Sequence, residues 1–351
     1  MSHSPSISII IPVYNVKPWL RRAVNSLENQ SFKSYEILLV DDGSTDGSGE
    51  LCDSLADYDM RIRVIHQENA GAANARNAAI GIARGTYLYF MDGDDWCDPD
   101  MLADMYAVAI EHDLDLLVTG FTIDTYYDNE GRYYRELRNA PNKIYASREE
   151  FRNEAYKLFD AQLLYAPWNK LYRRDYLNKH NLRFPTTFWD DLPFNLEVMR
   201  DIERVGCLDG HYFRARAESE NTKYRADMYD KREEEHRWMK DLFKYWGIDT
   251  PEVREFLARR YAERLVGCIE NVTNRNCTLS SEEKRATIQA MISTPQAREA
   301  LKLAKPRTKM MSVVLCPLKM GNVNLTMMQS SVISWVRQNS TNLFARLKAN
   351  R

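Results

Sequence analysis

Short apolar runs alternate with amphipathic segments through the first 120 residues, and this alternation constrains the fold more than any other feature. The runs are rich in β-branched and aromatic residues, as in strands covered on both faces. They comprise Ser6–Val13, Tyr35–Val40, Ile62–Ile65, Thr86–Met91 and Leu114–Gly120. The segments between them have helical spacing and comprise Val16–Leu27, Asp46–Tyr58, Ala72–Ala83 and Pro99–Glu111. The alternation predicts a doubly wound, mainly parallel α/β sheet with flanking helices, whose ligands bind beyond the carboxyl ends of the strands.

The pattern loosens after Gly120. We expect a hairpin or long loop, two short helices and a strand pair, at Asp124–Tyr145, Arg148–Phe159, Pro193–Asp201 and Val205–Ala217 respectively. From Tyr229 onward the spacing is helical almost throughout. We therefore predict a boundary near residue 225, with an α/β domain over residues 1–224 and a helical region over residues 225–351.

The composition describes a globular chain of nearly balanced charge. Its 48 Lys and Arg residues against 50 Asp and Glu exclude nucleic-acid binding through bulk positive charge as the main function. No apolar run approaches the ~18–20 residues that span a bilayer, and the N-terminus has no signal-peptide pattern. The six cysteines form no C-x-x-C pair, so we expect no zinc site or disulfide framework and a cytoplasmic location.

The end of the chain is basic. Beyond Glu299 there is no acidic residue, whereas the basic residues are Lys302, Lys305, Arg307, Lys309, Lys319, Arg337, Arg346, Lys348 and Arg351. Apolar residues are mixed with them. Two interpretations stay open: an amphipathic surface that lies on the inner face of an anionic membrane, or a basic helical face packed on the rest of the protein.

Polar motifs follow four of the predicted strands. They are Pro12-Val13-Tyr14-Asn15, Asp41-Asp42-Gly43-Ser44-Thr45-Asp46, Asn69-Ala70-Gly71 with Arg76 in the helix behind it, and Asp92-Gly93-Asp94-Asp95. An exposed aromatic can stack on a base, and an arginine can face a diphosphate. Asp92 and Asp94 point to one side of an extended chain and suit a hard divalent cation that also holds phosphate oxygens. Together the motifs predict a nucleotide site at one edge of the sheet.

These motifs resemble the nucleotide-binding half of family 2 glycosyltransferases, which have the GT-A fold. The matching stretches are SIIIPVYN, EILLVDDGSTDGS and NAGAANARNAAIGIARGTYLYFMDGDD. A second stretch is similar to bacterial capsule, exopolysaccharide and teichoic-acid transferases, through Trp168-Asn169-Lys170-Leu171-Tyr172-Arg173-Arg174, Arg183-Phe184-Pro185 and Trp189-Asp190-Asp191-Leu192-Pro193-Phe194. The resemblance divides the first domain into a nucleotide-binding half, residues 1–120, and an acceptor half, residues 121–224.

The resemblance also implies a role for each matching residue. Pro12, Val13, Tyr14 and Asn15 line the nucleoside pocket, Asp41 or Asp42 (we favour Asp42) contacts the base, and Asn69 and Arg76 lie near the diphosphate. Asp92 and Gly93 lie by the ribose or donor sugar, Asp94 is the metal ligand, Asp191 is the catalytic base, and Trp168, Asn169, Lys170 and Asp190 bind the acceptor. Gly93 stands where the family commonly has Ser, which implies a more flexible loop that keeps the carboxylates. Asp190 stands where the family commonly has Glu and is shorter by one methylene, which implies a different acceptor fit.

The implied reaction is an inverting transfer of a sugar from a UDP-sugar to a hydroxyl of a lipid-linked or cell-surface glycan. Asp191 would take the hydroxyl proton, while Mg²⁺ or Mn²⁺ on Asp94, together with Arg76, would offset the charge of the departing diphosphate.

Other readings of the same residues stay open. Asp190 and Asp191 also suit a helix N-terminus, Trp168 also suits a core position, and Arg214 and Arg216 would either close over the diphosphate or make surface salt bridges. The helical region has three open roles: self-association, membrane contact and covering the acceptor cleft.

Two other enzyme classes fit less well. No Gly-rich loop with a lysine follows the first strand, as a nucleotidyltransferase needs, and no G-x-G-x-x-G follows it, as a dinucleotide oxidoreductase needs. The alternative from a different class is a non-catalytic subunit that binds nucleotide or glycan in a polysaccharide assembly complex.

Overall fold

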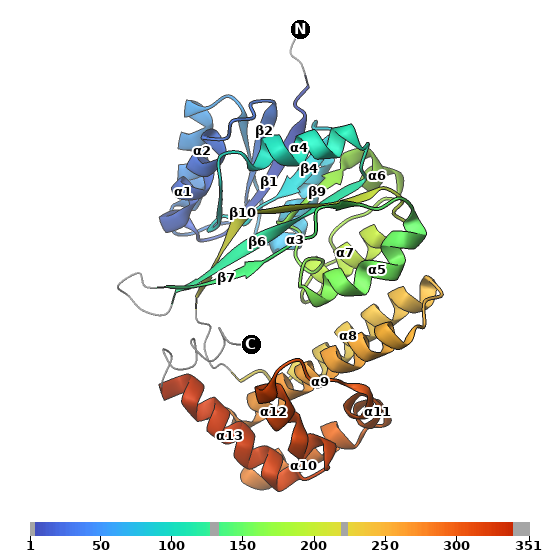
Figure 1. Ribbon diagram of the computed structural model, residues 1–351. Coiled ribbons are helices and arrows are strands. Elements are labelled where there is room, and N and C mark those ends of the chain that lie inside the picture. Colours follow the sequence, from blue (N-terminus) through green and yellow to red (C-terminus); the bar gives the residue numbers. More distant parts are fainter. Residues whose placement is uncertain (1–3, 127–132, 219–223, 340–351) are drawn as a thin grey trace. The chain divides into compact units, whose positions relative to one another are not determined.

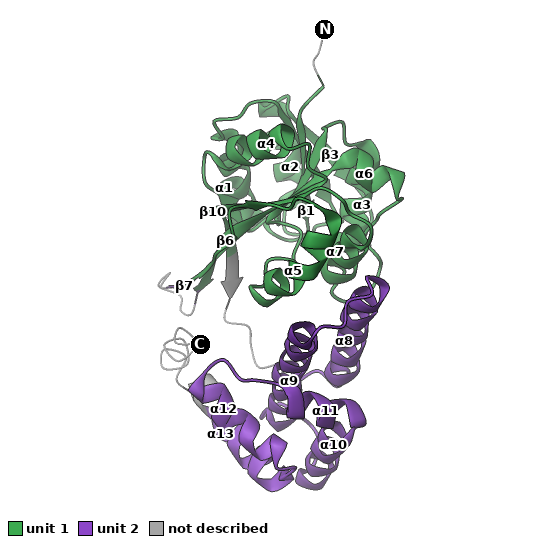
Figure 2. Ribbon diagram, turned by 45° about the vertical axis from the view of Figure 1, so that its right-hand side comes forward, with its two compact units in different colours: residues 1–125, 135–217 green, residues 126–134, 218–351 purple. Residues whose placement is uncertain are grey.

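The computed structural model describes residues 4–126, 133–218 and 224–339. The chain divides into two compact units (Figure 2). Unit 1 comprises residues 1–125 and 135–217, and unit 2 comprises residues 126–134 and 218–351. The division into separately folding domains at about residue 225 stays a prediction.

Unit 1 is built on one ten-stranded sheet (Figure 1). Its strands are β1 (Ile7–Val13), β2 (Tyr35–Asp41), β3 (Ile62–His66), β4 (Tyr87–Phe90), β5 (Trp96–Cys97), β6 (Leu116–Tyr126), β7 (Tyr133–Arg138), β8 (Lys143–Ile144), β9 (Lys170–Arg173) and β10 (Val205–Glu218). Its helices are α1 (Lys17–Glu28), α2 (Ser48–Tyr58), α3 (Ala72–Ile82), α4 (Met101–Glu111), α5 (Arg148–Asp160), α6 (Arg174–Lys179) and α7 (Asp191–Arg200).

The strand order β3-β2-β1-β4-β9-β6-β10-β5 confirms the predicted α/β fold. β1, β2, β3 and β4 pair in parallel, and β9 joins β4 and β6 as an antiparallel neighbour. The chain moves outward from β1 to β3 and then returns to place β4 on the other side of β1. The order therefore reverses between β1 and β4, and a crevice at such a switch point is where open α/β sheets bind ligands.

The apolar runs form the core as their composition predicts. Every residue of β2 and β4 is buried, and all but one residue of β1. The helices turn one apolar face inward; α1, for example, buries Leu20, Ala23, Val24 and Leu27. Because parallel strands covered on both faces need apolar side chains on both, the near-continuous apolar runs follow directly from this architecture.

One prediction about this unit is wrong. The strand pair expected near Val205–Ala217 is a single long strand, β10. Asp209-Gly210 reads as a turn, but Gly210 does not adopt a positive φ. A Cβ added at Gly120 of β6 would lie 2.9 Å from the Gly210 carbonyl oxygen, so at this point glycine serves the close approach of two backbones.

Unit 2 contains the helices α8 (Met228–Tyr245), α9 (Pro251–Thr273), α10 (Ser281–Ser293), α11 (Pro295–Leu303), α12 (Lys309–Lys319) and α13 (Val323–Asn339). The helical prediction for this region is confirmed. Side-chain oxygens of Thr250, Ser280, Thr294 and Thr308 cap the helices α9 to α12 in order. Their apolar faces surround α9, which supplies Tyr261, Leu265 and Ile269 to the core.

Candidate functional site

The carboxyl ends of the parallel strands lie in register at one edge of the sheet. Val13 of β1 pairs with Asp41 of β2, which pairs with His66 of β3. Beside them, Ile10 of β1 pairs with Phe90, the last residue of β4. The motifs that follow these strands therefore begin along one line, as the sequence predicts.

The loops after β1 and β2 are joined by hydrogen bonds. The Asn15 backbone N–H donates to Ser44 Oγ (3.2 Å), and Asn15 Oδ1 accepts from the Thr45 N–H (2.8 Å). Asn15 has a φ of 53°, in the left-handed region that asparagine tolerates better than most residues. Val13 is buried and Pro12 half-buried, whereas the Tyr14 ring is half exposed. Tyr14 is thus the member of this motif that offers an aromatic face to a ligand.

Asp41 and Asp42 both organise neighbouring loops. Asp42 is buried and accepts from Gln67 Nε2 (2.7 Å) and from the backbone N–H groups of Ala70 (2.9 Å) and Gly71 (2.8 Å). It therefore fixes the loop that contains the exposed Asn69. Asp41 accepts from the Ser44 N–H (3.1 Å) and lies 2.9 Å from His66 Nδ1, contacts that lower its pKa although burial opposes the change. Which of the two contacts a base stays a prediction.

Arg76 connects the two halves of the predicted site. Its guanidinium is buried on α3 and donates to Asp92 (2.9 Å), Asp190 (3.1 Å) and Asp191 (3.1 Å). These carboxylates follow β4 or begin α7, about a hundred residues apart in the sequence. One guanidinium facing three carboxylates leaves the centre with excess negative charge. The charge of Arg76 is thus shared among three carboxylates, and its predicted place near a diphosphate stays a prediction.

An aromatic layer supports the guanidinium. The Arg76 Cζ lies 5.1 Å from the centroid of the Phe184 ring, which stacks on Phe194 at 3.8 Å. Asn77, the next residue on α3, exchanges two 2.8 Å hydrogen bonds with the Phe184 backbone. Sequence reasoning quoted both phenylalanines in motifs but assigned them no function. The apolar layer explains them, because it removes water from beneath the ion pairs and strengthens them.

The backbone before α7 presents Asp190 and Asp191. Trp189 has a φ of 50°, which is unusual for a bulky residue and turns the chain into the helix. Asp190 is the N-cap residue and Asp191 the first helical residue, so both also benefit from the positive helix end. Asn195, one turn later, donates to the Asp191 carbonyl (2.8 Å) and accepts from Tyr172 OH (2.7 Å). This buried link fixes the start of α7 to β9, and no motif in the sequence indicates it.

The surroundings make Asp191 a weak acid. Burial raises its pKa from 3.8 to about 7, Arg76 opposes the rise, and Asp92 and Asp190 add to it. The pKa of Asp190 is raised as well, first by burial. The Asp191 side chain nevertheless keeps 34% of its surface exposed, so a ligand can reach it. A carboxylate with a pKa near neutral that water can reach is suited to general-base catalysis.

The loop after β4 holds the predicted cation ligand. Asp94 is half-buried, and its backbone carbonyl accepts from the Arg22 guanidinium (3.1 Å). Among the described residues, no three His, Cys, Asp or Glu side chains are grouped to hold a metal by themselves. Magnesium sites often combine one or two carboxylates with substrate phosphates, and the excess negative charge here would repel a diphosphate unless a cation neutralised it. The residues therefore fit a cation that is bound together with the nucleotide.

Gly93 has a steric reason to be glycine. A Cβ at this position would lie 3.0 Å from Val16 Cγ2 and 3.5 Å from the Pro12 carbonyl oxygen. The loops after β1 and β4 pack so closely at Gly93 that a side chain there would crowd Val16. This close packing accounts for glycine in place of the common Ser.

The residues predicted to bind the acceptor differ in their accessibility. Trp168 is half-buried, with its ring stacked on Phe213 (4.6 Å between centroids). Asn169 is buried and donates to the Thr119 and Leu163 carbonyls, and Lys170, 0% exposed, donates to the Leu163 carbonyl (2.7 Å). A supporting role under the site fits Asn169 and Lys170 better than the direct acceptor contact that we predicted, because their polar groups are satisfied inside the protein.

The two arginines on β10 have different outcomes. Arg214 forms an ion pair with Asp98 at 3.0 Å, in agreement with the salt-bridge alternative. The side chain of Arg216 lies outside the described part of the molecule.

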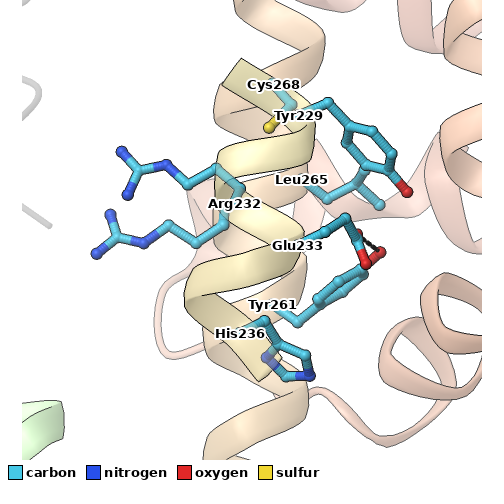
Figure 3. Close-up of a pocket in the computed structure, with 8 residues that line it drawn as sticks. Tyr229, Arg232, Glu233, His236, Tyr261, Leu265 and Cys268 are labelled. Atoms are coloured by element: carbon cyan, nitrogen blue, oxygen red, sulfur yellow. Dashed lines mark hydrogen bonds between the residues drawn. The ribbon is translucent and has the colours of Figure 1, made fainter. Parts of the chain in front are cut away.

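Unit 2 contains a small pocket of its own (Figure 3). Tyr229, Glu233, His236 and Tyr261 are among the residues that line it. Glu233 accepts from Tyr261 OH (2.5 Å) and from Gln296 Nε2 (2.9 Å). Burial lowers the pKa of His236 to about 3, so this imidazole is neutral. These polar groups serve helix packing.

Comparisons with known proteins identify relatives of this chain. Residues 8–180 match the model of Glycosyl transferase family 2. The uncharacterized glycosyltransferase EpsJ of Bacillus subtilis is 37% identical over 207 residues, 58% of this chain and 59% of that protein. Glycosyltransferase GlyA of Streptococcus pneumoniae is 36% identical over 174 residues, 48% of this chain and 24% of that protein. The chain thus spans about three fifths or less of the curated relatives that it matches.

A solved structure shows the same fold over nearly the whole chain. S. aureus TarS 1-349, in complex with UDP-GlcNAc, has a TM-score of 0.60 at 20% identity, covering 95% of this chain and 91% of that one. Together with the family match, this confirms the resemblance seen in the sequence motifs. Residues 8–180, just under half of this chain, are thus similar to glycosyl transferase family 2.

Proposed function

We propose that this chain is an inverting glycosyltransferase that moves a sugar from a UDP-sugar to a hydroxyl of a glycan acceptor. The observation that carries the proposal is the shared contact of Arg76 with two carboxylates. Its guanidinium brings Asp191 of α7 next to Asp92, which follows β4. A base on the acceptor side and carboxylates on the donor side are what an inverting displacement needs. TarS binds UDP and UDP-GlcNAc, which supports a uridine nucleotide as the donor.

Each group has a defined task in this reaction. Asp191 Oδ takes the proton from the acceptor hydroxyl as its oxygen attacks the anomeric carbon. Arg76 keeps the Asp191 carboxylate in place and stabilises its charged form. Asp94 would hold a divalent cation, which when bound offsets the charge that the leaving diphosphate gains. Tyr14 and the loops after β1 and β2 would bind the nucleoside, and Trp168 the acceptor sugar.

The resemblance to capsule, exopolysaccharide and teichoic-acid transferases supports a lipid-linked or cell-surface glycan precursor as the acceptor. It is also the reason to place the reaction at the inner face of the cell membrane.

A donor screen tests this function. The protein is incubated with a panel of UDP-sugars, glycan acceptors and Mn²⁺ or Mg²⁺, and the products are identified by mass spectrometry. We expect transfer from one donor class, a loss of about 10²–10⁴-fold in Asp191→Asn, and unchanged donor affinity in that variant. Asp57→Asn, an exposed aspartate on α2, is the matched control and keeps wild-type transfer.

The screen also separates the alternative. Tight UDP binding without transfer from any donor to any acceptor would contradict the proposal and support a non-catalytic binding subunit. Near-normal transfer by Asp191→Asn would leave the enzyme but reject this base.

A further inference from the structure

The last helix of unit 2, α13, has hydroxyl side chains at its most buried positions. Thr326, Ser330 and Ser334 are buried, and Ser330 Oγ lies 2.7 Å from Thr273 Oγ1 of α9. Val323 is buried beside them, and Met327 and Ile333 pack partly against the core of unit 2. The buried face of α13 therefore carries polar hydroxyl groups, whereas the buried face of a surface helix is usually apolar.

The outer side of α13 is apolar. Leu325, Met328, Val332 and Trp335 are all exposed, the last three by 61%, 57% and 63%. Their spacing of three, four and three residues puts them on one face of the helix. A helix whose outer face carries such a stripe is typical of a surface that another apolar phase covers.

α12 shows a second stripe of this kind. It buries Val314, Leu315 and Leu318 but exposes Val313 and Cys316, and Met320 just after its end is exposed as well. Gln329 Nε2 of α13 donates to the Val313 carbonyl of α12 (3.0 Å), so the two helices are joined. We refer to Val313, Cys316, Met320, Leu325, Met328, Val332 and Trp335 together as the outer stripes.

The positive charge of the chain after Glu299 indicates which partner covers the outer stripes. Lys302, Lys305, Arg307, Lys309 and Lys319 are all exposed, and no acidic residue follows Glu299. A second copy of the chain, docked symmetrically, would bring the same cations together and repel. A bilayer with anionic headgroups offers opposite charge together with an apolar interior, and interfacial tryptophan is common in such contacts.

We propose that the outer stripes of α12 and α13 bind the surface of an anionic lipid bilayer. In the described part of the chain, no helix combines the length and the apolar character needed to cross a membrane. The contact is therefore with the headgroup region, where apolar side chains enter and the lysines remain among the phosphates. This inference goes beyond the proposed transfer reaction and does not depend on it.

Vesicle flotation of the full chain tests the proposal. The probes are phosphatidylcholine vesicles with and without phosphatidylglycerol, at low and high salt. The variant Met328→Glu with Val332→Glu should lose at least about tenfold in affinity for the anionic vesicles. The control Tyr58→Glu with Met60→Glu makes the same charge change at exposed apolar positions of unit 1 and should bind as the wild type does. Lys305→Gln with Lys309→Gln should weaken binding and its salt dependence.

The outcomes are distinct. Binding of the wild type to anionic vesicles that the stripe variant loses, with unchanged helix content by circular dichroism, supports the proposal. Two results would overturn it: a wild type that ignores anionic vesicles, or a stripe variant that binds them equally well. A concentration-dependent dimer of the wild type that the stripe variant abolishes, without vesicle binding, would instead assign the face to a second copy.

Discussion

Replacing Arg76 by glutamine should destabilise unit 1 strongly and in a pH-dependent way. The change leaves Asp92, Asp190 and Asp191 next to one another without their shared guanidinium. Breaking a buried ion pair from one side costs about 3–5 kcal/mol. We take about 3 kcal/mol, the lower end, because the side chains of Asp92 and Asp191 are about a third exposed and water screens them.

That cost becomes a measurable change in melting temperature. At roughly 2–4 °C per kcal/mol for a domain of this size, Arg76→Gln should melt roughly 6–12 °C lower at pH 8. The loss should shrink at pH 5, because the pKa values of Asp190 and Asp191 are already raised and protonation removes the repulsion. Differential scanning calorimetry at both pH values measures this.

Arg200→Gln, on the same helix as Asp191, is the matched control. Its exposed pair with Glu197 (3.1 Å) should contribute only about 0–1 kcal/mol. An Arg76→Gln melting temperature equal to that of the control at pH 8, or a loss that does not change with pH, would refute the electrostatic reasoning.

Three further substitutions test individual contacts. Asp191→Asn removes a carboxylate whose pKa rises from 3.8 in the unfolded chain to about 7 in the folded one, so wild-type stability falls as pH rises between these values. The variant should therefore melt higher than the wild type at pH 8 and equally at pH 4, and equal melting of the two proteins at both pH values would contradict this. Asp94→Asn should weaken the Mn²⁺-dependent part of UDP affinity in titration calorimetry; unchanged cation dependence would exclude Asp94 as the ligand. Gly93→Ser should cost about 1 kcal/mol in chemical denaturation because its Cβ approaches Val16, and the cost should vanish in a Val16→Ala background unless the packing explanation is wrong.

The sequence predicts the sheet and the placement of the polar motifs along one edge of it well, because both depend on local patterns. Apolar runs such as Tyr35–Val40 have few alternatives to a buried parallel strand. Once the strands are parallel, the residues directly after them must lie at one edge. The position of Asp42 and Asp92 relative to β2 and β4 follows from this geometry alone.

Side-chain partnerships across long sequence distances could not be predicted in this way. Nothing near Arg76 shows that it contacts Asp190, since the two are joined only when α7 packs beside α3. Lys170 was assigned to acceptor binding through the family resemblance, but in the structure its buried amino group donates to carbonyl groups such as that of Leu163. On α13, helical spacing is evident, but spacing alone does not tell which face turns inward.

The pH dependence of transfer by the wild type and by Asp191→Asn tests the role of Asp191 most directly. Because the base must be ionised, wild-type kcat/KM should fall with decreasing pH below an apparent pKa of about 7. In Asp191→Asn the residual rate should be low and should lack this decrease at acidic pH. If kcat/KM of Asp191→Asn still decreases with an apparent pKa near 7, or if the wild type keeps full activity at pH 5, another group takes the proton.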